Sequence, residues 1–352
     1  MVLKLLKPSH SIFYKWLTQA NLLGALSLIE LDTPPDDFLQ NEPEGAAFHK
    51  AFLASGINGF KCGYLSISRD ALRVTVVPFF TGTFSLTTLL PDGLLKKSLS
   101  WIKFRYVCIG HPSTDFGLIE GEISAEILAL VNATLTKKAP LIAYKGFPNT
   151  LPLDGFNCAR GWPVSILTIK GDYYTQLDGH RRTDFRHKLE KAQTLRVELY
   201  KQLPESLVLP IYELYLNTYH HAPTRFERLT ADYFRHTATL SQYLLFFEAD
   251  TLIGFVQIIG KNKKATFSYI GMDYQRNQQY GLYYVICLRS IEFCTREGYQ
   301  QIELGVSSYH FKQLLGGQLT ETHLYYQHKK TFINKLLGKL KFLLEPSAYE
   351  LR

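Results

Sequence analysis

The chain has 352 residues, 46% hydrophobic and 20% charged, a balance that excludes wholesale disorder and suits about two folded domains. Lys and Arg number 39 against 31 Asp and Glu, and the formal net charge of +8 suits an acidic partner without identifying one. No uncharged apolar run is long enough to span a bilayer, and we expect no signal peptide. Five scattered cysteines favour a reducing, cytoplasmic location without disulfides or structural zinc.

The first half alternates helical and β-rich patterns. A mixed helical stretch, Ser11 to Leu28, precedes an acidic linker, Asp32 to Glu44. We next expect a hairpin formed by the strands 62–68 and 72–80. A buried strand at 105–110, a helix at 122–135 and another strand at 141–144 follow. A Pro- and Gly-rich link, Gly146 to Pro163, then indicates a boundary. We therefore expect an N-terminal domain at 1–160 and a C-terminal domain at 161–328.

The second half predicts an antiparallel meander followed by helix, strand, short helix and strand. A strand at 164–169 and a basic helix at 182–193 come first, and two further helices follow at 205–219 and 230–240. Three strands with short turns follow, at 243–248, 252–259 and 265–272, and such turns make them antiparallel neighbours. The helix Leu282 to Glu297 is apolar nearly all round and should be buried. Elements at 301–306, 309–315 and His323 to Gln327 complete the unit.

This order places the N-terminus of the buried helix beside the end of the strand Ala265 to Met272. Free backbone N–H groups at such a helix start bind phosphate well. The sequence therefore indicates a phosphate-bearing ligand at this junction.

Three segments resemble the GNAT acyltransferase superfamily. Asp172 to Ala192 resembles its aromatic and basic segment, Tyr269 to Gly298 its acyl-CoA strand, pyrophosphate loop and helix, and Glu303 to Gly317 its terminal segment. The first half is similar more loosely, through Gly110-His111-Pro112 and Asp115-Phe116-Gly117. More closely, the chain resembles the bacterial FemAB-like and CelD-like proteins. That resemblance implies an α/β (α+β) fold of two GNAT-like domains in tandem, each a mixed, mostly antiparallel sheet flanked by helices.

The resemblance implies an N-acyltransferase that moves an acyl group from acetyl-CoA or another acyl-CoA to a primary amine by direct attack. The acceptor would be a small molecule or a cell-envelope amine. Some FemAB relatives use aminoacyl-tRNA, so a FemX-like aminoacyltransferase with a peptidoglycan or peptide acceptor is the first alternative. A catalytically silent binding scaffold is the second, because Arg276 to Tyr283 (RNQQYGLY) has one glycine and a tyrosine where the family has a small residue.

Acyl transfer to an amine needs a neutral amine, donors for the developing oxyanion and a proton for the leaving group. In the family, the strand before the pyrophosphate loop splays from its neighbour and turns N–H groups toward the donor. The donor-binding residues that the resemblance implies are Ile270, Gly271, Met272, Arg276, Gln279, Tyr280, Gly281, Leu282 and Ser307. By resemblance Tyr309 is the acid, with a packing role as the alternative. Glu303 or Asp273 is the base candidate, unless water relays the proton or both carboxylates are merely solvated or paired.

The substrate contacts that we expect are Asp115, Arg182, Arg186, Asp273 and Lys312. Both arginines belong to a basic segment, Gln176 to Lys201, with seven Lys or Arg against four Asp or Glu. This segment suits an anionic acceptor or tRNA, and a solvated helix face is the alternative. The histidines His220, His221 and His236 lack the spacing of metal ligands, and we predict no metal.

The last segment, 329–352, predicts a basic amphipathic helix. Phe332, Leu336, Leu340 and Leu344 repeat at four-residue steps, and the lysines lie mostly elsewhere. Docking on its own domain or on a second subunit of a homo-oligomer is the favoured interpretation. Peripheral contact with the anionic inner face of a membrane is the alternative.

Overall fold

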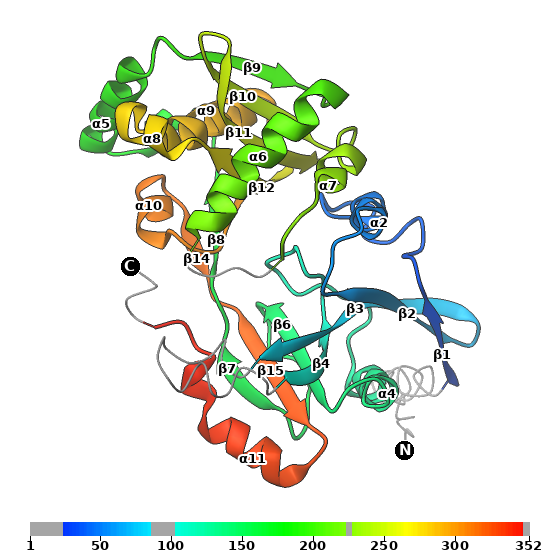
Figure 1. Ribbon diagram of the computed structural model, residues 1–352. Helices are drawn as coiled ribbons and strands as arrows, with labels where there is room; N and C mark the ends of the chain where they lie inside the picture. The colour runs from blue at the N-terminus through cyan, green and yellow to red at the C-terminus, as the bar shows by residue number, and fades with distance from the viewer. Residues whose placement is uncertain (1–23, 86–102, 223–226, 348–352) are drawn as a thin grey trace, which may run out of the picture.

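The computed structural model of the chain describes residues 24–85, 103–222 and 227–347. Two β-sheets lie one above the other in the view of Figure 1, each with its own helices. The helical stretch expected from Ser11 falls mostly outside the described residues, and its end is a strand, β1 (Leu26–Leu31). Within the described ranges, no helix is long and apolar enough to cross a membrane.

The first sheet consists of seven strands in one path and a short strand at its side. Their spatial order is β1, β2 (Lys61–Arg69), β3 (Leu72–Ser85), β4 (Lys103–Ile109), β6 (Leu141–Phe147), β15 (His323–His328) and β7 (Asn157–Arg160), and β5 (Glu120–Gly121) pairs with β3. Helix α4 (Ala125–Leu135) packs on this sheet, and Ile127 and Val131 share its core with Val107. The Ser124 side chain caps α4 by accepting from the Ile127 N–H.

The second sheet has helices on both faces. Its strand order is β14 (Gln318–Thr320), β8 (Val164–Thr168), β13 (Gln301–Gly305), β12 (Lys264–Met272), β11 (Thr251–Lys261), β10 (Gln242–Glu248) and β9 (Arg196–Tyr200). One core holds α9 (Leu282–Arg296) and α5 (Gly179–Lys191), with the short η2 (Tyr174–Gln176) beside them. The other core holds α6 (Glu205–His221) and α7 (Ala231–His236). As the sequence predicts, α9 is largely buried.

Both sheets repeat one arrangement, a parallel pair of strands joined by a helix. The two units are β4–α4–β6 and β12–α9–β13, and the other pairings among the described residues are antiparallel. One strand is exchanged: β15 follows the second unit in the chain but joins the first sheet, whereas β8 lies in the second sheet with the other strands of its half. The prediction that His323 to Gln327 completes the second unit is therefore wrong. An alternating strand pattern fixes which face is buried but does not determine which sheet the strand enters.

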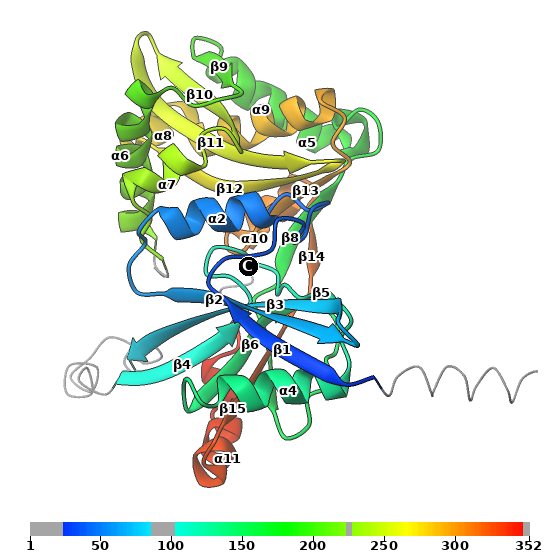
Figure 2. The ribbon, with the colours of Figure 1, turned by 90° about the vertical axis from the view of Figure 1, so that its right-hand side faces the viewer.

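Helix α2 (Ala46–Ala54) lies between the two sheets, as Figure 2 shows. Its Phe48 and Phe52 belong to the same core as Leu229 and Tyr233 beside and within α7. The two halves of the chain therefore share a core. The sequence pattern does not predict this helix, because α2 has few polar residues to mark an exposed face.

Candidate functional site

The parallel strands β12 and β13 pair over only part of their length. Their registered partners run from Lys264 with Gln301 to Thr266 with Glu303, whereas β12 continues along β11 to Met272. We call this divergence the strand fork. It is the splay that the resemblance implies, and it leaves the β12 backbone beyond Thr266 free of β13.

An irregularity in β12 lies at the strand fork. The register with β11 shifts between Gln257 and Ile258, whose partners are Tyr269 and Phe267, so Ser268 is the extra residue. Within the described part of the chain, the buried Ser268 hydroxyl has no hydrogen-bond partner. Bulges re-aim side chains and are frequent next to active sites. Ser268 is thus a candidate site residue that the sequence analysis missed.

Glu303 stands at the last paired position before the strand fork. Its neighbours Ile302 and Leu304 are buried in the core on the α9 side, so strand alternation directs Glu303 to the opposite face. Burial, and after it the negative charge of Asp115, raises the pKa of Glu303 to about 8. A carboxyl group with such a pKa can take or give a proton near neutral pH.

Asp115 from the first half and Lys312 from the second half both form hydrogen bonds with the backbone of Val306. The Val306 N–H donates to Asp115 Oδ2 at 3.0 Å, and Lys312 Nζ donates to the Val306 carbonyl at 2.6 Å. Burial lowers the pKa of Lys312 to about 8, although the nearby charge of Asp115 opposes that change. The structure therefore brings Asp115, Glu303 and Lys312, all predicted from the sequence, into one place.

The turn between β13 and α10 (Tyr309–Leu314) has a strained backbone. Ser307 and Ser308 have φ angles of 69° and 48°, in the left-handed region, and Gly305 has 76°. Such strain in non-glycine residues tends to persist at functional sites. Ser307 is exposed in this turn, and its predicted contact with a donor stays a prediction.

Two further charged residues from the first half complete what we call the interdomain charged cluster: Glu44, Asp115, Lys145, Glu303 and Lys312. Burial, then the charges of Glu303 and Asp115, holds the pKa of Glu44 well above its ordinary value, and Lys145 acts in the opposite direction. Both residues escaped the sequence analysis. Glu44 ends a linker that looks solvated, and Lys145 continues an ordinary strand pattern.

A buried carboxyl group also lies near this cluster. Tyr269 on β12 donates its hydroxyl hydrogen to Glu227 Oε1 at 2.7 Å. Burial raises the pKa of Glu227, and the charge of Lys145 acts in the opposite direction. Charged residues of the cluster thus act on the pKa of Glu227 from the other half of the chain.

The Tyr309 side chain is fully buried, and its hydroxyl donates to the Pro163 carbonyl at 2.8 Å. This bond ties α10 to the residue that precedes β8. The contact accounts for a packing role, and the proposed acid role of Tyr309 stays a prediction.

The junction of α8 (Tyr274–Tyr280) and α9 corresponds to the expected pyrophosphate loop. The Asp273 carboxylate caps α8 by accepting from the N–H groups of Gln275 and Arg276, at 2.8 and 3.3 Å. Gly281, with φ at 63°, links the two helices, and an added Cβ there would meet open space. The Asn277 side chain then accepts from the Tyr283 N–H at 2.9 Å. One N–H group at the start of α9 is therefore already bonded within the chain.

Three residues predicted to bind the donor are engaged beside this junction. Arg276 forms an ion pair with Glu248 at 2.9 Å and donates to Gln279 at 3.4 Å. Tyr280 donates to the same Glu248 at 2.6 Å. With Asp273 occupied as a helix cap, Glu303 is the better placed of the two base candidates.

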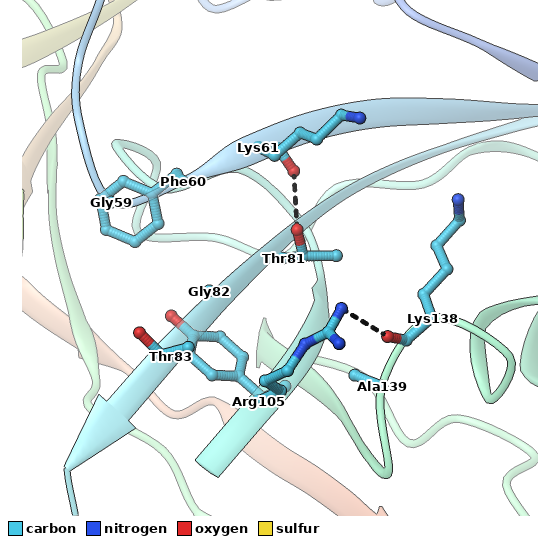
Figure 3. A pocket seen from close by; sticks show the side chains of 10 residues that line it. Gly59, Phe60, Lys61, Thr81, Gly82, Thr83, Arg105, Lys138 and Ala139 are labelled. Carbon is cyan, nitrogen blue, oxygen red and sulfur yellow. Dashed lines mark hydrogen bonds between the residues drawn. The ribbon is translucent and has the colours of Figure 1, made fainter. Parts of the chain in front are cut away.

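Two pockets lie away from the cluster. One, of about 430 Å³, lies between α5 and α9 and is lined by Arg182, Arg186 and Arg289 among others. The other, of about 310 Å³, lies on the first sheet beside Lys61 and Arg105 (Figure 3). The first pocket thus contains both arginines predicted from the sequence, and the second contains no predicted site residue.

No family model and no curated protein sequence matches the chain. Solved structures do match it. The C-terminal domain of a candidate lysylphosphatidylglycerol synthetase from Agrobacterium fabrum aligns over 76% of this chain and 85% of that one, with a TM-score of 0.52 and 11% identity. FemX aligns over 83% of this chain and 93% of its own, with a TM-score of 0.51 and 10% identity. L-PGS from Bacillus licheniformis aligns over 78% of this chain and 87% of its own, with a TM-score of 0.50 and 10% identity.

At these identities the likeness concerns the fold. The chain has a tandem GNAT-like fold, with mixed α/β architecture and two mostly antiparallel sheets. The fold predicted from the sequence is confirmed.

Proposed function

We propose that this protein transfers an activated acyl group to a primary amine by direct attack. The strand fork would hold the donor carbonyl, and the interdomain charged cluster would manage the proton. One observation carries the proposal. Glu303, with its pKa raised to about 8, stands at the strand fork and faces charged groups of the first half.

The chemistry follows from this placement. The ammonium form of the acceptor gives a proton to the Glu303 carboxylate, and the lone pair of the neutral amine then attacks the donor carbonyl. Backbone N–H groups of β12 beyond Thr266 donate to the developing oxyanion. The intermediate collapses as the bond to the leaving oxygen or sulfur breaks, and the leaving atom takes up the proton that the attacking nitrogen releases. No covalent intermediate with the protein is needed.

An aminoacyl ester of tRNA is the donor that the junction of α8 and α9 favours. The Asn277 cap uses an N–H group that a pyrophosphate would need, which weakens this site for CoA. Arg182 and Arg186 are exposed in the pocket beside α9, and neither pairs with a carboxylate of the described residues. Arginines of this kind suit the phosphates of an RNA backbone.

Acyl-CoA is the second candidate donor. It is favoured by the open space around Gly281, where a phosphate could approach the backbone closely. In this case Asn277 must release the Tyr283 N–H when the donor binds. Gly281, Leu282 and the β12 residues Ile270 to Met272 would then hold the acyl-CoA.

The two donors can be separated by binding. Filter binding with mixed charged tRNA should give salt-sensitive retention, weakened by Arg182→Gln with Arg186→Gln. The charge-matched control is Lys261→Gln with Lys263→Gln, in the exposed turn between β11 and β12. Acetyl-CoA in a thermal melt should leave the midpoint unchanged. A shift with acetyl-CoA and no retention of tRNA would establish the second donor instead.

Turnover can be tested with the same probes. Label from tRNA charged with radioactive amino acids should move to a panel of primary amines and cell-envelope extracts. Glu303→Gln should abolish this transfer and leave tRNA retention intact. If Glu303→Gln transfers label as fast as the wild type, Glu303 is not the base.

Tyr309 can be tested separately. If it protonates the leaving group, Tyr309→Phe lowers the rate of transfer far more than it lowers donor affinity. An unchanged rate, together with a lower melting temperature, would leave Tyr309 with the packing role that its bond to Pro163 indicates.

A further inference from the structure

Helix α11 (Thr331–Lys339) and the following turn η3 (Lys341–Leu343) expose an apolar face. The described residues include twelve exposed large hydrophobic side chains, and five of them lie here: Phe332, Leu336, Leu340, Phe342 and Leu343. Phe332 is 80% exposed and Phe342 is 63% exposed. A concentration of exposed apolar side chains marks an interaction surface rather than ordinary surface variation.

The opposite face of α11 is fixed to the first sheet. Asn157 on β7 donates to Asn334 Oδ1 at 2.9 Å, and the His328 N–H donates to the same oxygen at 3.0 Å. The Tyr326 hydroxyl donates to the Leu337 carbonyl at 3.1 Å. Because these bonds fix how the helix is rotated, the exposed apolar face cannot turn inward without breaking them.

Lysines surround the apolar face. All five lysines of this region are exposed: Lys329, Lys330, Lys335, Lys339 and Lys341. None forms an ion pair with a carboxylate in the described part of the chain. A second copy of the chain would bring the same positive charges against them, whereas a negatively charged surface would complement them.

Figures 1 and 2 both place α11 at the end of the molecule farthest from the second sheet. We propose that α11 and η3 lie on an anionic phospholipid bilayer, with the apolar face among the acyl chains and the lysines at the headgroups. The arrangement matches an interfacial amphipathic helix, whose apolar stripe and flanking cations act together. This inference does not depend on the acyl donor or acceptor.

Vesicle co-sedimentation of the full chain tests the proposal. The protein should sediment with vesicles of equimolar phosphatidylglycerol and phosphatidylcholine, should stay in solution with phosphatidylcholine alone, and should be released by salt. Replacing Lys335 and Lys339 by Gln should weaken binding about twenty-five-fold, at about fivefold for each cation lost near the surface. Phe332→Ser with Leu336→Ser should weaken binding even at low salt, because it removes apolar contact and leaves the charge unchanged.

Matched controls isolate the surface. Lys261→Gln with Lys263→Gln changes the net charge equally, and Leu72→Ser removes an apolar side chain that is 74% exposed elsewhere. Both should bind like the wild type. Equal binding to the two kinds of vesicle, or equal loss in the control variants, would overturn the proposal. So would a dimer, seen by light scattering, that Phe332→Ser dissociates.

Discussion

Replacing Glu303 by Gln should stabilise the protein at alkaline pH and have little effect at acidic pH. The pKa of Glu303 rises from an ordinary 4.5 to about 8 in the folded protein, chiefly through burial. Because the folded-state pKa is the higher one, the unfolded chain loses its proton first. Wild-type stability therefore falls as the pH rises from about 4.5 to about 8. Glutamine has no such proton, and the variant escapes this loss.

The size of the effect follows from the pKa difference. About 3.5 pKa units correspond to about 5 kcal/mol at 1.36 kcal/mol each. Glu303 keeps partial contact with solvent, so we expect less than half of this, about 2 kcal/mol at about pH 8.5 and close to zero at about pH 5. Urea unfolding followed by tryptophan fluorescence measures both values. The exposed Glu213 on α6 provides the control, Glu213→Gln. A Glu303→Gln variant that is less stable than the wild type at pH 8.5, or equally shifted at both pH values, would refute the reasoning.

Two further changes test the geometry of the site. Asn277→Ala frees the Tyr283 N–H and should lower stability by about 1 kcal/mol in a thermal melt, as the loss of a helix cap does; an unchanged midpoint would mean that the cap contributes nothing. Gly305→Ala and Gly298→Ala should each cost about 1–2 kcal/mol, because both glycines have left-handed backbones. Gly305→Ala should lower the free energy of unfolding by at least about 1 kcal/mol more than Gly298→Ala does. A Cβ at position 305 would lie 2.8 Å from Asp115 Oδ2, whereas a Cβ at position 298 would meet open space. Equal losses in chemical denaturation would contradict the close contact.

The elements with strong periodic patterns could be predicted from the sequence. The meander of β10 to β12 and the buried helix α9 are present close to their expected bounds. The short strands β7, β9 and β14 were not predicted, since three to five residues give little periodic signal. The pairing of β15 with the first sheet was also not predicted, because the residue pattern of this strand would suit either sheet.

The candidate site was predictable where a residue belongs to a recognisable segment. Asp115 comes from one such segment, Glu303 and Lys312 come from another, and the structure places the three residues together. Glu44 and Lys145 could not be inferred, because their importance arises only when the two halves pack. Their sequence surroundings are those of a solvated linker and an ordinary strand.

The exchange of β15 has a consequence for how the chain is made. Its His328 pairs with Leu141, so the first sheet lacks an internal strand until the ribosome has completed almost the whole second half. Such pairing between distant residues raises contact order and slows folding. The first half cannot mature alone during synthesis, and its unpaired β6 edge stays exposed for that time. The two halves therefore form a single folding unit, and neither is expected to be stable when expressed on its own.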